Sequence, residues 1–67
     1  MKKDKVAILA KNIYELRARL DILWNLVAKY DKEEENRKEG MVEILQEEMS
    51  GIHFLEAKIK REVDNLF

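Results

Sequence analysis

The clearest structural signal in this chain is the sequence VAILAKNIYELRARLDILWNLVAKY at residues 6–30. Its apolar residues recur at alternating intervals of three and four, which places them along one side of an α-helix. In heptad notation (positions a to g), β-branched residues fall mostly at a and leucine mostly at d, as in coiled coils. The members of this first seam are Val6, Leu9, Ile13, Leu16, Leu20, Leu23, Val27 and Tyr30. We therefore predict a helix over about residues 4–31, with Asp4 as its N-cap.

The apolar side of this helix is wider than a coiled-coil seam. Ile8 and Ile22 fall at position c, Leu26 at g and Trp24 at e. Together with the seam they cover more than half of the helix circumference in projection. A single partner helix would leave several of them in water, so we expect this helix to pack against more than one neighbour.

A second seam with the same spacing predicts a second helix over about residues 38–66. Its one interruption is Glu56 at an a position, where the adjacent Leu55 supplies the apolar side chain. Gly51 lowers the helix propensity by about 1 kcal/mol relative to alanine. It would either admit a close neighbour or split the helix, and we favour one continuous helix. The members of the second seam are Val42, Leu45, Met49, Ile52, Ile59, Val63 and Leu66.

Residues 31–40 contain no apolar side chain, so we place the turn within them. Two capping-box patterns compete for the start of the second helix, Asp31 with Glu34 and Asn36 with Glu39. Gly40 is a third signal, since it would terminate a prolonged first helix. The sequence leaves these alternatives open.

The chain has 67 residues and no cysteine, which predicts a single small domain over residues 1–67 without disulfides. Chains of this size bury only about 60% of their unfolded surface and need extra stabilisation, often from oligomerisation. Two helices joined by a short polar turn predict an all-α antiparallel hairpin. Because its apolar arcs are too wide for one helix–helix interface, we expect a homodimer that forms a coiled-coil-like four-helix bundle.

No catalytic, cofactor-binding or metal-binding residues are predicted. His53 is the only histidine, and Glu56 one turn later reverses the Glu-x-x-His order of di-iron bundles. Ser50 is the only serine or threonine, and no glycine-rich phosphate loop is present. We therefore expect a protein that is not an enzyme and has no small-molecule substrate.

Glu56 is the most unusual acid, because it falls at a core-facing a position. A polar a residue can fix register or oligomeric state if it finds a partner, for which Arg17, Arg19 and Lys60 are candidates. The alternative is that Glu56 bends outward while Leu55 fills the seam.

The net charge of −1 and the pI near 5.8 argue against a general nucleic-acid or membrane-surface binder. The apolar runs are no longer than five residues, whereas a membrane span needs about 20. The short apolar stretch that ends at Lys11 lacks the features of a signal peptide. We expect a cytoplasmic location.

The function expected from these patterns is that of a small interaction or regulatory protein acting through self-association and protein–protein contacts. Trp24, Leu26, Phe54 and Tyr14 are the candidate partner surface. The alternative is an RNA-binding hairpin dimer. In overall pattern the chain resembles the acidic helical hairpins of plasmid copy-control proteins, which dimerise and clamp paired RNA loops, although no motif is shared.

Overall fold

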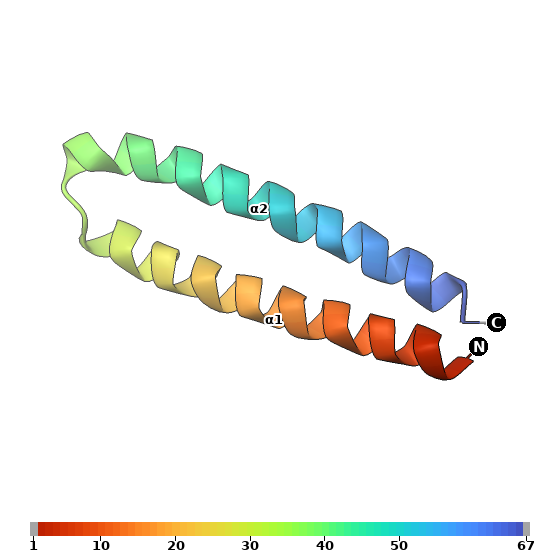
Figure 1. The fold of residues 1–67 in the computed structure, drawn as a ribbon. Coiled ribbons are helices and arrows are strands. Elements are labelled where there is room, and N and C mark those ends of the chain that lie inside the picture. Colours follow the sequence, from red (N-terminus) through yellow and green to blue (C-terminus); the bar gives the residue numbers. More distant parts are fainter. Residues whose placement is uncertain (1, 67) are drawn as a thin grey trace.

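The chain folds into a two-helix antiparallel hairpin in the computed structural model, which describes residues 2–66 and the side chains of residues 4–66. Helix α1 comprises Lys2–Lys32 and helix α2 comprises Glu35–Asp64, and the described residues contain no strand. Figure 1 shows the two helices lying side by side along their length, with both chain ends at the end opposite the turn. The hairpin measures 52 × 15 × 10 Å. The all-helical hairpin predicted from the spacing of the apolar residues is thus confirmed.

The turn consists of Glu33 and Glu34 alone, so α2 begins about three residues earlier than the apolar pattern predicts. The amide of Glu33 donates to the carbonyl of Tyr30 (3.2 Å), and Glu34 has the extended backbone of an N-cap. Residues 35–40 are helical without apolar side chains because their helix propensity is adequate. An ion pair between Lys38 and Glu35, at 3.3 Å and one turn apart, further stabilises this first part of the helix.

The predicted capping residues are not used. Asp31 lies inside α1 and Asn36 inside α2, while the side chain of Glu34 makes no capping hydrogen bond. At the other end of α1 the helix already begins at Lys2, so Asp4 lies in the first turn and is not the N-cap. An acid in that turn still interacts favourably with the free backbone N–H groups.

Both glycines lie within α2, which is continuous from Glu35 to Asp64. Gly40 therefore does not terminate α1, and Gly51 does not split α2. No glycine has a positive φ. The helix tolerates both, because the loss of propensity at one position is small compared with the packing of a 30-residue helix.

The two helices meet along their d and g rows rather than along a and d. The d residues of both seams lie half-buried or buried between the helices, and the neighbouring g residues complete the contact. Leu26 and Leu55 are apolar g residues, and this draws the contact toward that side. Among residues 4–66, only Ile52 (2% exposed) and Leu55 (5%) are buried apolar residues. The hairpin by itself therefore has a thin core.

None of the helices in the described part of the chain is both long enough and apolar enough to pass through a membrane.

Candidate interaction surface

The a rows of both helices remain uncovered and form what we call the apolar face. When antiparallel helices meet along d and g, their a rows fall on the same side of the pair and their c rows on the other. The contacts agree, since a shallow pocket on the c side brings together Ile8 of α1 and Asn65, the C-cap of α2. The side chains of the apolar face are 37–54% exposed. They are Val6, Ile13, Leu20 and Val27 of α1 and Val42, Met49 and Val63 of α2.

Contacts between the helices fix which of these residues lie at the same level. Near the open end the Nζ of Lys5 donates to the carbonyl of Asn65 (3.0 Å). Near the turn the Nζ of Lys38 lies 5.2 Å from the ring centre of Tyr30. The levels of the apolar face that follow from this register are Val6 with Val63, Ile13 with Glu56, Leu20 with Met49, and Val27 with Val42. Three levels are wholly apolar and one contains a single acid.

A polar contact crosses the g edge of the hairpin seam. The buried Asn12 (6% exposed) donates from Nδ2 to both carboxylate oxygens of Glu62, at 2.8 and 2.7 Å. Two turns further along α1, Arg19 passes over Gly51, where an added Cβ would lie 3.1 Å from Nη1. The g edge of the helix contact is thus partly polar. The apolar face lies on the other side of the hairpin, next to the d edge.

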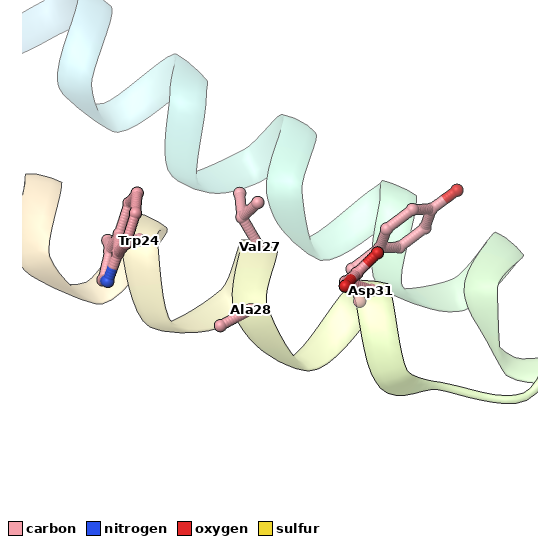
Figure 2. Close-up of a pocket in the computed structure, with 5 residues that line it drawn as sticks. Trp24, Val27, Ala28 and Asp31 are labelled. Carbon is pink, nitrogen blue, oxygen red and sulfur yellow. The ribbon is translucent and has the colours of Figure 1, made fainter.

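The predicted partner residues do not form one surface. Leu26 lies half-buried in the hairpin seam, whereas Trp24 (74% exposed), Tyr14 and Phe54 are exposed on different sides. Trp24 does border the apolar face, since it lines a shallow pocket with Val27 near the turn. Figure 2 shows both side chains rising from the same side of α1.

Glu56 interrupts the α2 row of the apolar face and is exposed. None of the ion pairs among the described side chains includes it, so it pairs with none of its three candidate partners. Arg19 instead pairs with Glu15 on its own helix, at 3.8 Å. Glu56 is therefore available to a molecule that covers the face.

The described side chains contain no group of three or more His, Cys, Asp or Glu residues able to hold a metal ion. His53 and Ser50 both lie exposed on α2, and the hydroxyl of Ser50 donates to the carbonyl of Gln46 (3.1 Å). No described histidine or acid lies in hydrogen-bonding contact with that hydroxyl. Neither residue is part of a visible catalytic arrangement.

The residue that sequence reasoning missed is Asn12. The g row of α1 reads Lys5, Asn12, Arg19, Leu26, with polar residues at three of four positions, so a pattern of apolar spacing does not include it. The available signal was the matching g row of α2, where Glu62 offers an acceptor near the same end.

In comparisons with protein-family models, curated proteins and solved structures, nothing matches this chain.

Proposed function

We propose that this chain is a small non-enzymatic interaction or regulatory protein that acts by covering its apolar face, through self-association and contacts with other proteins. The observation that carries the proposal is the apolar face itself, two aligned rows with seven apolar side chains in total that the hairpin leaves open. Soluble monomers rarely expose continuous apolar patches of this kind.

The dimensions of the face fit an interface. A side of 52 × 15 Å corresponds to about 800 Å², which is what each partner buries in a standard protein–protein interface. The pattern also fits a four-helix bundle, in which each helix packs against two neighbours. The d and g rows of each helix pack against the other helix of the same chain. The a row is left to pack against a helix of a second molecule.

The test is absolute mass by light scattering on a size-exclusion column, over a hundredfold range of concentration. The chain has a mass of 8.0 kDa, so we expect about twice that value for the wild type. Leu20→Glu puts a carboxylate into the face and should give the mass of a single chain. Ala18→Glu is the matched control, because it adds the same charge to an exposed position outside the face.

The wild type would contradict self-association if it ran as a single chain at every concentration. Unchanged mass in the Leu20→Glu variant would contradict the assignment of the face instead. The two results separate the existence of a dimer from its location.

RNA binding is the second candidate, supported by one local arrangement. Tyr14 and Arg17 line the same shallow pocket on α1, which would offer a ring for base stacking and a guanidinium for phosphate. Asp21 lines that pocket too and would repel phosphate, so this function ranks second. A mobility shift with a structured RNA that is lost on Lys11→Ala with Arg17→Ala would support it.

A further inference from the structure

We propose that the occupant of the apolar face is a second copy of this chain turned end for end, so that the turn of each hairpin lies beside the open end of the other. This inference rests on the proposed self-association and adds the direction of pairing. It follows from two independent features, the distribution of charge along the hairpin and the position of Glu56.

The charge of the hairpin is unequal along its length. The half nearest the turn, residues 18–51, carries nine acidic and five basic side chains, for a net charge of −4. The half nearest the chain ends, residues 2–17 and 52–66, carries eight basic and five acidic side chains, for a net charge of +3. The antiparallel fold creates this polarity, because it brings the ends of the chain together and leaves the acidic middle at the turn (Figure 1).

Pairing with the turns at the same end would set the two acidic halves against each other and the two basic halves against each other. Turning one copy end for end sets each acidic half against a basic half. Complementary potentials of this kind suppress the wrong arrangement and select the right one. The charge distribution therefore favours the end-for-end dimer.

The levels of the apolar face give the same answer. With the turns at the same end, every level meets its own copy, so both Glu56 side chains enter one layer of the bundle. Turned end for end, the level of Ile13 and Glu56 meets the level of Leu20 and Met49, and the outer valine levels meet each other. Each Glu56 then lies one heptad, about 10 Å, from the other along the bundle. Like charges buried in the same layer are costly, and this arrangement avoids them.

The experiment measures the distance between the two turns of a dimer. The described residues include no cysteine and none occurs in the sequence, so Asn36→Cys at the turn allows a single spin label per chain. Pulsed electron paramagnetic resonance then reports the label-to-label distance. End-for-end pairing predicts a distance close to the 52 Å length of the hairpin. Same-end pairing predicts a distance within about 25 Å, because neighbouring helices pack about 8–10 Å apart.

The control is Ala18→Cys, which labels an exposed position near the middle of the hairpin. It should give a short distance in either arrangement and so shows that the labelled chains associate. The mass of each labelled sample is measured alongside. A main population at the long distance for Asn36→Cys supports the inference.

Two other results would overturn the end-for-end pairing. They differ in whether they also contradict self-association. Dimeric mass with a mainly short distance at Asn36→Cys contradicts the direction of pairing while leaving self-association intact. The mass of a single chain, with no distance recorded for Ala18→Cys, contradicts both the direction and the self-association on which it rests.

Discussion

At the scale of single residues, the pairing of Asn12 with Glu62 is the most informative contact in the hairpin. It occupies a g position of each helix, where Leu26 and Leu55 elsewhere supply apolar packing. A polar pair inside a seam lowers stability relative to apolar residues but favours the one register in which both groups are satisfied. We infer that this contact fixes how far α2 runs along α1.

Removing only one member of the pair should be costly. Asn12→Ala leaves the half-buried carboxylate of Glu62 without its donor, and we expect the free energy of unfolding to fall by about 1–3 kcal/mol. Urea denaturation at fixed protein concentration measures this. Asn25→Ala is the control, since it removes an asparagine from an exposed position of the same helix. Equal effects of the two substitutions would contradict the role given to Asn12.

Replacing both members should behave differently. In Asn12→Leu with Glu62→Leu, no polar group is stranded and the seam becomes continuous, so we expect stability at least equal to the wild type. The same denaturation experiment tests it. A double variant less stable than Asn12→Ala would show that the hydrogen bonds contribute net stability beyond register.

At the scale of elements, the two glycines of α2 provide a matched comparison. An added Cβ at Gly40 meets nothing within 4 Å, whereas at Gly51 it meets the guanidinium of Arg19 at 3.1 Å. Gly40→Ala should raise the free energy of unfolding by about 0.8–1 kcal/mol through helix propensity alone. Gly51→Ala should give a smaller gain, because Arg19 must move aside. Thermal unfolding compares them, and an equal gain at both positions would argue against a close approach of Arg19.

The sequence predicted the elements well and their contact only in part. The alternating spacing of residues 6–30 indicates a helix whatever its partners are, and the d leucines lie on the buried side in any packing. The flank that completes the contact was not determined, because Val27 at a and Leu26 at g both continue a three–four pattern with Leu23. The turn was not located either, since residues 31–40 are polar and helix-compatible throughout.

That ambiguity has a measurable consequence for two leucines that the sequence treats alike. Leu23 lies in the hairpin seam, while Leu20 lies on the apolar face and is 47% exposed. Leu23→Ala should lower the stability of the hairpin by about 2 kcal/mol at any protein concentration. Leu20→Ala should instead weaken association, so its cost should appear mainly at high concentration. Unfolding curves at two concentrations distinguish the two, and identical behaviour would contradict the division into seam and face.

At the scale of the whole molecule, the thin core means that the hairpin needs a further source of stability. Two buried apolar residues among the described 4–66 are few for any independent domain, and small domains without disulfides or metals are often stabilised by association. The apolar face supplies the missing burial when it is covered. Self-association should therefore add to the stability of the hairpin, by an amount that grows with protein concentration.

Association of the folded hairpin makes the melting temperature depend on protein concentration. A hundredfold increase adds about 2.7 kcal/mol to the stability of a dimer, because association follows mass action. At a few degrees per kcal/mol, we expect the melting temperature of the wild type to rise by about 10 °C. Circular dichroism at the two concentrations measures the shift, which Leu20→Glu should abolish and Ala18→Glu should preserve, because only Leu20 lies on the apolar face. A wild-type melting temperature independent of concentration would mean that the hairpin is stable with its face uncovered, and the thin core would then be sufficient.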